Sequence, residues 1–328
     1  MSSANNKNKL SKKYAPHIVA ASSMLASITT MSLSHPFEVL KIGQQLTFGN
    51  TTFNPRHKIK YYFKGLSSLN LAIVGKTFIR FRAYDYFCNL YENPQTGEIS
   101  KFDMFKVGAF LGFIESVWVI PFENLKSRLV GNGLTTSEKL QGRTNIGPLP
   151  SKLNRNPVYD IYSNRFSIYY RNEYRVKPSM TFPQAVKEIW QVDGVKGYFR
   201  GSLATMYKNM ASAFIYFSFY SSMKNAFNKE NDRSKSILIG VASCSLVVIF
   251  TQPVDLIKTR LQSNRYGPRY YTGNLDCFRH TITEEGVSAF FKGWFPRLLK
   301  VGIINSGVGL GLYQYYEKIL TLDDSVFQ

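Results

Sequence analysis

Long apolar segments alternate with polar, charged stretches along the chain, and several of the apolar segments end at a proline. The run SILIGVASCSLVVIF at 236–250 leads directly into TQPVDLIKTRLQ at 251–262. A proline inside a helix kinks it, because proline lacks the backbone donor and clashes with the preceding turn. The pattern therefore predicts a membrane-length helix that changes direction at Pro253 and then carries charges at regular offsets.

The proline motif occurs three times. The stretches LSHPFEVLKIGQQ (33–45), WVIPFENLKSRLV (118–130) and TQPVDLIKTRLQ share a proline, an acid and a lysine at the same spacing. One such match is weak, but three, each ending an apolar segment of helical length, indicate an internal repeat. The shared residues are Pro36, Glu38 and Lys41; Pro121, Glu123 and Lys126; and Pro253, Asp255 and Lys258.

A second motif follows each proline motif. An aromatic residue, a basic residue and a glycine stand at 63–65, 199–201 and 291–293, each just before another long segment. The interleaved order predicts an all-α membrane protein with six transmembrane helices. These helices form three pseudo-symmetric two-helix repeats around a central cavity. We expect the six helices at 17–46, 67–91, 102–130, 203–227, 235–263 and 295–320.

The motifs also divide the chain. We expect a polar tail at 1–14 and repeats at 15–95, 100–228 and 234–322. The second repeat holds an insertion at 131–178, rich in Asn, Arg, Tyr and Pro and without helical periodicity. This insertion is interpreted as a solvated loop, and a regulatory or partner-binding loop is the alternative.

Composition narrows the function classes. The net charge of +20 implies anionic partners, which include nucleic acid, acidic lipid headgroups and small anions. The three cysteines form no CxxC pair, the four histidines are scattered, and no GxSxG, Walker or GxGxxG element occurs. We therefore expect no catalytic residues, no metal and no cofactor. The low mean hydropathy alone favours a soluble protein, but helices around a water-filled cavity keep their ionisable residues on the cavity face.

The three Px[DE]xx[KR] motifs, each followed by [FYW][KR]G, resemble the mitochondrial carrier family. The resemblance extends from about His17 to Leu320, apart from the 131–178 insertion. It implies a multi-pass transporter of the mitochondrial inner membrane, with short helices on the matrix side, that works by alternating access and is imported without a cleaved presequence. We also expect a monomer with a small anionic substrate, and no nucleic acid partner.

Four further stretches look like the tricarboxylate (citrate) carriers of that family. They are GKTFIRFRAYD (75–85), GFIESVWVIPFENLK (112–126), GVKGYFRGSLATMYKN (194–209) and the segment 270–301. This likeness implies exchange of tricarboxylates such as citrate. A dicarboxylate, oxoacid, phosphate or sulfate substrate stays open as the alternative.

In the family reading, the charges of the proline motifs form a matrix gate. The acids Glu38, Glu123 and Asp255 would pair between helices with Lys41, Lys126 and Lys258, while Gln45 and Gln262 brace the ring. Exposed ion pairs contribute only about 0–1 kcal/mol each. We therefore expect a gate that substrate binding can reverse.

The opposite, cytoplasmic gate departs from the family pattern [FY][DE]xx[KR]. Cys88 and Glu317 stand where the resemblance requires a base. Asp85 and Lys224 are the one pair that remains. The hypothesis is a weakly latched matrix-open state and a resting protein open to the cytosol.

Substrate selection should rest on cations of the even-numbered helices. Lys76 and Arg80 share one helix face, and an arginine can grip a carboxylate with two hydrogen bonds. The residues expected to bind substrate are Lys76, Arg80, Lys208, Tyr216, Arg297 and Lys300. Tyr216 stands where the resemblance leads us to expect an arginine. The alternative for the cations is a headgroup or gate role.

The aromatic-basic-glycine turns carry a separate prediction. Helix starts offer free N–H groups to phosphates, and the resemblance implies that cardiolipin binds there. The residues are Lys64, Gly65, Arg200, Gly201, Lys292 and Gly293, and simple helix-initiating turns are the alternative. Arg260 has no assigned role. A basic nucleic-acid-binding protein and a membrane enzyme are the rival function classes.

Overall fold

The computed structural model describes residues 16–47, 58–91, 101–140, 177–227, 233–263 and 273–308, with a few isolated positions besides. Within these residues every element is a helix and none is a strand, so the all-helical prediction is confirmed. The long helices are α2 (Pro16–Gln45), α3 (Leu66–Tyr91), α4 (Lys101–Leu140), α8 (Ser202–Phe227) and α9 (Arg233–Gln262). The shorter ones are η1 (Ile59–Tyr61), α7 (Phe182–Tyr198), α11 (Asn274–Glu285), η2 (Val287–Phe291), α12 (Trp294–Leu298) and η3 (Leu299–Val308).

Each proline motif lies inside a long helix rather than at its end. Pro36, Pro121 and Pro253 stand within α2, α4 and α9, and each helix continues beyond its proline. The expected helix at 295–320 begins as α12 and continues as the π-helix η3. Its continuous description ends at Val308, so the expected end at 320 lies outside the described residues.

The third long helix extends further than the sequence suggested. We expected 131–178 to lack helical structure, but α4 continues through Gly131 and Gly133 to Leu140, so this was wrong for 131–140. A glycine costs a helix roughly 0.5–1 kcal/mol relative to alanine. Burial of Val130 and Leu134 offsets that cost, since both lie in the main core cluster. Residues 141–169 of the expected loop lie outside the described residues.

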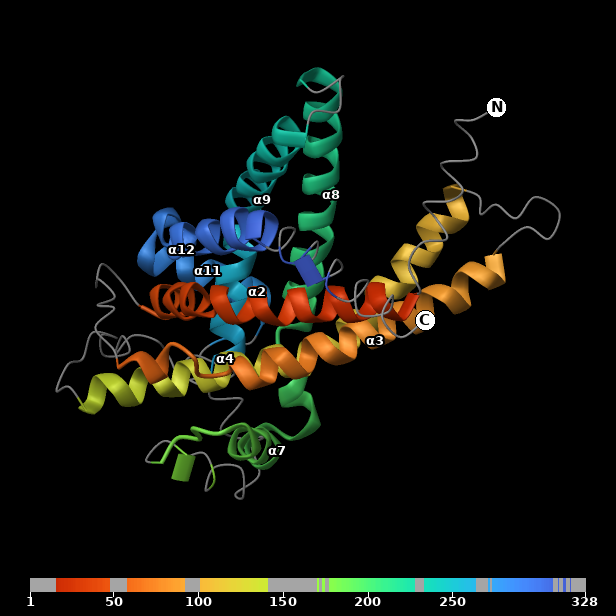
Figure 1. The fold of residues 1–328 in the computed structure, drawn as a ribbon. Helices are drawn as coiled ribbons and strands as arrows, with labels where there is room; N and C mark the ends of the chain where they lie inside the picture. The colour runs from red at the N-terminus through yellow and green to blue at the C-terminus, as the bar shows by residue number, and fades with distance from the viewer. Residues whose placement is uncertain are drawn as a thin grey trace, which may run out of the picture.

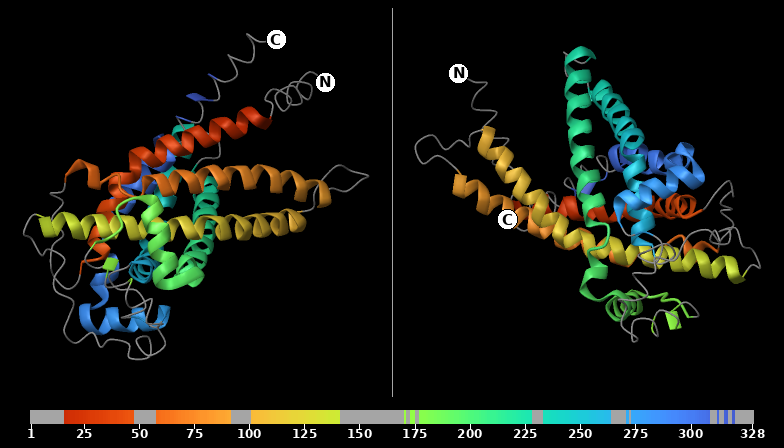
Figure 2. Two further views of the ribbon diagram at one scale, coloured as in Figure 1. Left: turned by 90° about the horizontal axis from the view of Figure 1, so that it is seen from below. Right: turned by 180° about the vertical axis from the view of Figure 1, so that it is seen from behind.

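The long helices associate as hairpins that diverge from a shared end. Helices α3 and α4 lie side by side, as do α8 and α9, and the two pairs point in different directions (Figures 1 and 2). Helices α2, α4 and α9 contact one another pairwise. Because these three carry the proline motifs, their mutual contacts place the three motifs together.

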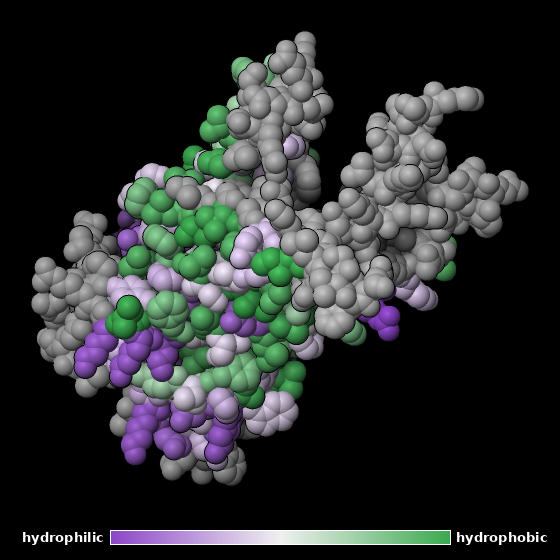
Figure 3. Space-filling model, viewed as in Figure 1, coloured by the Kyte–Doolittle hydropathy of each residue, from purple (hydrophilic) through white to green (hydrophobic). Residues whose placement is uncertain are grey.

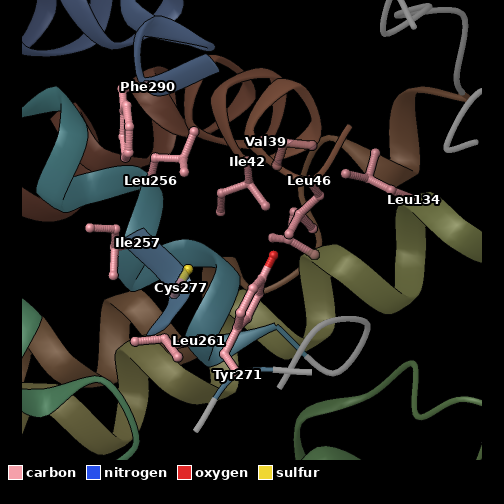
Figure 4. Packing of buried hydrophobic residues seen from close by; sticks show 11 residues of the cluster. Val39, Ile42, Leu46, Leu134, Leu256, Ile257, Leu261, Tyr271, Cys277 and Phe290 are labelled. Carbon is pink, nitrogen blue, oxygen red and sulfur yellow. The ribbon is translucent and has the colours of Figure 1, made fainter. Parts of the chain in front are cut away.

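A hydrophobic core holds this shared end (Figure 4). Apolar side chains from α2, α4 and α9 pack there against residues of α11, of η2 and of the segment just before α11. The buried members of the cluster are Val39, Ile42, Leu46, Val130, Leu134, Leu256, Ile257, Leu261, Tyr271, Cys277 and Phe290. A second cluster, of Leu125, Leu129, Ala185 and Ile189, packs α7 against α4. The end with the proline motifs is therefore packed as a solid core.

The outer faces of the long helices expose large apolar side chains, among them Phe78, Phe214, Leu238 and Phe250. In Figure 3 hydrophobic residues spread across the visible face, and hydrophilic residues gather toward the edge formed by α4 and α7. One helix in the described part of the chain, Leu238–Gln262 of α9, is long and apolar enough to cross a membrane by length and composition. The other long helices have the length, at 1.5 Å per residue, but carry more polar and charged residues.

Candidate gate and substrate site

Six charged side chains of the three proline motifs pair in a closed ring where α2, α4 and α9 meet. Each helix gives its lysine to one neighbour and its acid to the other. The pairs, with nitrogen–oxygen distances, are Lys126–Glu38 at 2.8 Å, Lys258–Glu123 at 2.6 Å and Lys41–Asp255 at 2.9 Å. The three helix ends are thus joined by ion pairs in a cycle.

The ring is buried, which corrects the expectation of exposed ion pairs. At most 17% of any of its side chains is exposed. Burial strengthens the attraction but also removes hydration from both charges, so the net stabilisation of a buried pair is small. Removing one partner, however, leaves the other charge stranded and costs about 3–5 kcal/mol. A complete ring can therefore open reversibly, whereas an incomplete one is heavily destabilised.

Two lysines expected to bind substrate pair with carboxylates of the ring in this structure. Lys300 Nζ lies 3.0 Å from Glu38 Oε2, and Lys208 Nζ lies 3.0 Å from Asp255 Oδ1. In this conformation both ammonium groups are paired with gate carboxylates. An anion that binds Lys208 or Lys300 must therefore compete with the ring for them.

These contacts leave the ring layer with surplus positive charge. It holds five lysines against three carboxylates, an excess of two positive charges. Like charges held close together in a poorly solvated place repel strongly unless an anion neutralises them. The surplus positive charge of this layer therefore favours the binding of a small anion.

Gln45 and Gln262 differ in their contacts. Gln45 donates its amide to Asp255 Oδ2 at 3.2 Å and accepts a hydrogen bond from Thr259 at 2.7 Å. Gln262 accepts a hydrogen bond from Ser127 Oγ at 3.2 Å. Gln45 thus braces a ring carboxylate directly, while Gln262 joins α9 to α4 beside the ring.

Arg297, also expected to bind substrate, is buried against α9. Its guanidinium donates to Gln252 Oε1 at 2.9 Å and to Thr251 Oγ1 at 2.6 Å. In this conformation the guanidinium joins α12 to the two residues of α9 that precede Pro253. These contacts match the alternative of a structural role at the gate.

Lys76 and Arg80 meet a carboxylate that the sequence reading did not assign. Arg80 grips Glu115 of α4 with two hydrogen bonds, Nε to Oε1 at 2.6 Å and Nη2 to Oε2 at 2.8 Å. Lys76 Nζ lies 3.6 Å from the same Oε2. The clue in the sequence was an isolated acid inside the apolar run GFIESVWVI. Tyr216, the remaining residue of the predicted substrate set, stacks on Tyr220 at 5.7 Å between ring centroids.

The three turn glycines pack against the proline-motif helix of the next repeat. Gly65, Gly201 and Gly293 all adopt positive φ, which disfavours any residue with a Cβ. A Cβ at Gly65 would lie 3.2 Å from Lys126, one at Gly201 would lie 3.2 Å from Gln262, and one at Gly293 would lie 3.0 Å from the Lys41 carbonyl. The turns are thus fitted to the gate.

The basic residues of these turns contact protein in this structure. Lys64 Nζ donates to the Met180 carbonyl at 2.8 Å, and Lys292 Nζ lies 2.6 Å from Glu285. Arg200 lies 3.6 Å from Asp193. Binding of cardiolipin at these turns stays a prediction.

Arg260, left without a role by the sequence, joins α9 to α11. It is fully buried, and its Nη1 lies 2.5 Å from Glu285 Oε1. Burial alone would raise the pKa of the Glu285 carboxyl, but hydrogen bonds and charge from Arg260 and Lys292 hold that pKa below its ordinary value. Burial also raises the pKa of the neighbouring Cys277 thiol to about 12, which keeps it protonated and unreactive at neutral pH.

Arg128 makes the corresponding link in the second repeat. It lies 3.3 Å from Glu188 and 2.7 Å from Asp193, both of α7. The two arginines thus fix the shorter helices α7 and α11 to the proline-motif helices. The sequence carried a clue, because Arg128 and Arg260 stand two residues after Lys126 and Lys258.

The side chains of Asp85 and Lys224 lie outside the described residues, as do those of Cys88 and Glu317. The expectation of a weak cytoplasmic gate therefore stays a prediction.

Comparison with known proteins agrees with this geometry. The family model described as "Mitochondrial carrier protein" matches residues 160–231 and 232–324. An uncharacterized mitochondrial carrier of Saccharomyces cerevisiae is 29% identical over 302 residues, which cover 90% of this chain and 93% of the relative. The tricarboxylate transport protein of the same yeast is 24% identical over 319 residues, 91% of this chain and 93% of the relative. The succinate/fumarate mitochondrial transporter of Saccharomyces cerevisiae is 25% identical over 312 residues, which cover 87% of this chain and 86% of the relative.

Three proline-motif helices joined by a ring of ion pairs, in a chain that the carrier family model matches, fit the class of small-molecule carriers. This chain belongs to the mitochondrial carrier family. Members of that family are transporters rather than enzymes, so membership favours transport of a small molecule over the rival readings as a nucleic-acid-binding protein or a membrane enzyme.

Proposed function

We propose that the protein exchanges small carboxylate anions across the mitochondrial inner membrane by alternating access. The observation that carries this proposal is the buried ring with two surplus lysines. A closed ring bars passage at the proline-motif end, and its excess of positive charge gives an entering anion a reason to bind there. Binding energy gained by the anion is then available to open the ring.

The proposed architecture has six membrane-spanning helices in repeats 15–95, 100–228 and 234–322 around one central cavity. The protein acts as a monomer. Polar and charged residues of the long helices face the cavity, which accounts for their moderate hydropathy. Cardiolipin binds at the turns after Phe63, Phe199 and Phe291, where helix N-termini attract phosphate.

Lys208 and Lys300 couple substrate binding to the gate. Both pair with ring carboxylates when the ring is closed, at 3.0 Å each. An incoming carboxylate takes over the ammonium groups and leaves Asp255 and Glu38 with fewer partners. The closed ring then loses stabilisation at the moment the substrate is bound. With only Asp85 and Lys224 left of the cytoplasmic gate, the empty carrier rests open to the cytosol.

Tricarboxylates such as citrate are the first candidate substrates. Four sequence stretches resemble tricarboxylate carriers, and a yeast relative carries that name. Dicarboxylates are the second candidate, because Glu115 lowers the positive charge around Lys76 and Arg80 and another yeast relative is named for succinate and fumarate. Tricarboxylates and dicarboxylates would both bind through the same lysine and arginine side chains.

Reconstituted liposomes test the proposal. Purified protein is inserted into vesicles preloaded with citrate, malate, oxoglutarate, phosphate or a nucleotide, and uptake of labelled citrate and malate is measured. We expect carboxylate uptake that requires internal carboxylate. Robust exchange of phosphate or nucleotide, with none of any carboxylate, would overturn it.

A further inference from the structure

Glu115 holds the two cations of the first repeat in one cluster. Its side chain is 9% exposed, and both of its oxygens accept hydrogen bonds from Arg80. Lys76 lies on the same face of α3, one turn earlier, and its ammonium group is 3.6 Å from Glu115 Oε2. Lys76 lies about 15 Å along α3 from its first residue, at 1.5 Å per residue. That depth is near the middle of a hydrocarbon core of about 30 Å.

Close packing of α3 against α4 fixes this cluster. A Cβ at Gly75 would lie 2.2 Å from Trp118 Cε2, so only glycine lets the indole lie against α3 at this level. Trp118 stands one helical turn after Glu115 on α4, and Gly75 adjoins Lys76 in sequence. The indole contact therefore holds the carboxylate and the two cations at the same level of the two helices.

The cluster carries one net positive charge, from two cations and one carboxylate. Tyr216 of the second repeat corresponds to Arg80 when residues are counted from the turn glycines, and it adds no charge. A substrate carboxylate that binds Arg80 must replace or share the bonds made by Glu115. Every further negative charge on the substrate is then repelled by the Glu115 carboxylate.

We infer that Glu115 is a specificity-determining residue that sets how much negative charge the substrate site accepts. Its carboxylate stands in for a substrate carboxylate on Arg80 in the empty carrier. By cancelling one of two cations it narrows the advantage that a trianion would have over a dianion at this cluster. This inference rests on the proposed carboxylate exchange and adds the residue that sets its charge preference.

A charge series in proteoliposomes tests the inference. Exchange of a tricarboxylate, citrate, and of a dicarboxylate, malate, is measured for the wild type, Glu115→Gln, Glu115→Asp and Glu115→Gln/Lys76→Gln. Glu115→Gln keeps the shape and removes the charge, so we expect the citrate-to-malate ratio of kcat/KM to rise about tenfold, as for a unit charge 5–6 Å away in a partly hydrated site. Glu115→Asp keeps the charge and should keep the ratio near that of the wild type. The double variant restores the net charge and should return the ratio toward the wild-type value.

Two results would overturn the inference. One is an unchanged ratio in Glu115→Gln, with both rates altered equally, because Glu115 would then only position Arg80. The other is a ratio that rises equally in Glu115→Asp. Should Glu115→Gln fail to fold, the ratio is compared between the wild type and Lys76→Gln, where removal of a cation must lower it. A wild type that exchanges neither citrate nor malate, nor any other carboxylate such as oxoglutarate, is a different outcome, since it refutes the proposed function itself.

Discussion

The first repeat and the other two repeats hold their cations at different depths. Counted from the turn glycine, Ala72 of the first repeat corresponds to Lys208 and Lys300, which pair with the ring. The cations of the first repeat, Lys76 and Arg80, stand one and two helical turns further along α3 and pair with Glu115 instead. In the proposed carrier the same repeat unit thus serves two purposes. Two repeats supply cations to the gate, and one supplies them to a separate site nearer the middle of the helices.

The contrast extends to the links between long and short helices. Arg128 and Arg260 anchor α7 and α11 through buried carboxylates, whereas Gly43 stands at the corresponding position of α2. The ring follows the same asymmetry. Glu38 and Asp255 each contact an additional lysine from an even-numbered helix, and at the corresponding place beside Glu123 the first repeat has Ala72. The three repeats therefore share their sequence motifs but differ in which charged residues they carry at corresponding positions.

The largest effect is expected from removing a ring carboxylate. Asp255→Asn removes the carboxylate partner of Lys208 and leaves Lys41 with Glu38 alone, and breaking such a buried network costs about 3–5 kcal/mol. We expect exchange in proteoliposomes to fall by about two orders of magnitude and the thermal midpoint in detergent to drop. Glu284→Gln on α11, which removes a partly exposed acid, is the matched control and should retain exchange. Full exchange by Asp255→Asn would show that the ring plays no part in transport.

A smaller effect is expected at a turn glycine. Gly293→Ala forces an L residue to a φ of 80° and places a methyl group 3.0 Å from the Lys41 carbonyl. The left-handed backbone alone costs about 1–2 kcal/mol. We expect a lower thermal midpoint in detergent. Gly112→Ala in α4, where the new Cβ meets open space, should instead raise the midpoint slightly, because alanine favours a helix over glycine by roughly 0.5–1 kcal/mol. Equal midpoints for the two variants would mean that the turn is not fitted to the gate.

The smallest effect tests the asymmetry itself. Ala72→Lys gives the first repeat the lysine that the other two repeats have, and should provide Glu123 with a second cation. A more fully paired ring opens less readily, so we expect exchange to slow by about two- to fivefold, on the scale of a partly compensated ion pair. The control is Ala72→Met, which adds a chain of similar length without charge. Slowing to the same extent by methionine would mean that bulk at this position, not charge, limits exchange.

Regular features of the fold could be predicted from the sequence, since periodicity and prolines act locally. The helices that contain Pro36, Pro121 and Pro253 were predicted from repeated motifs. The continuation of α4 to Leu140 was missed, because Gly131 and Gly133 suggested a break and the burial of Leu134 is a tertiary effect.

Site residues that recur in all three repeats could be predicted from the sequence, whereas a residue that occurs in one repeat could not. Lys41, Lys126 and Lys258 recur at one spacing, so their motif was visible, and their pairing across helices is a property of the three-dimensional arrangement. Glu115 occurs in one repeat only, and no local rule connects it to Arg80 on another helix. The burial of the ring was likewise invisible, because the core around Leu256 is assembled from distant segments.

A charge swap at Glu123 and Lys258 tests the gate most directly, because no lysine from the described part of an even-numbered helix forms an ion pair with Glu123. The two atoms lie 2.6 Å apart, so exchanging their charges preserves the pair and changes only its direction. We expect Glu123→Lys and Lys258→Glu each to abolish carboxylate exchange in proteoliposomes, and the double variant Glu123→Lys/Lys258→Glu to recover a substantial part of it. A double variant that folds but stays as inactive as the single variants, or single variants with full activity, would contradict the gate.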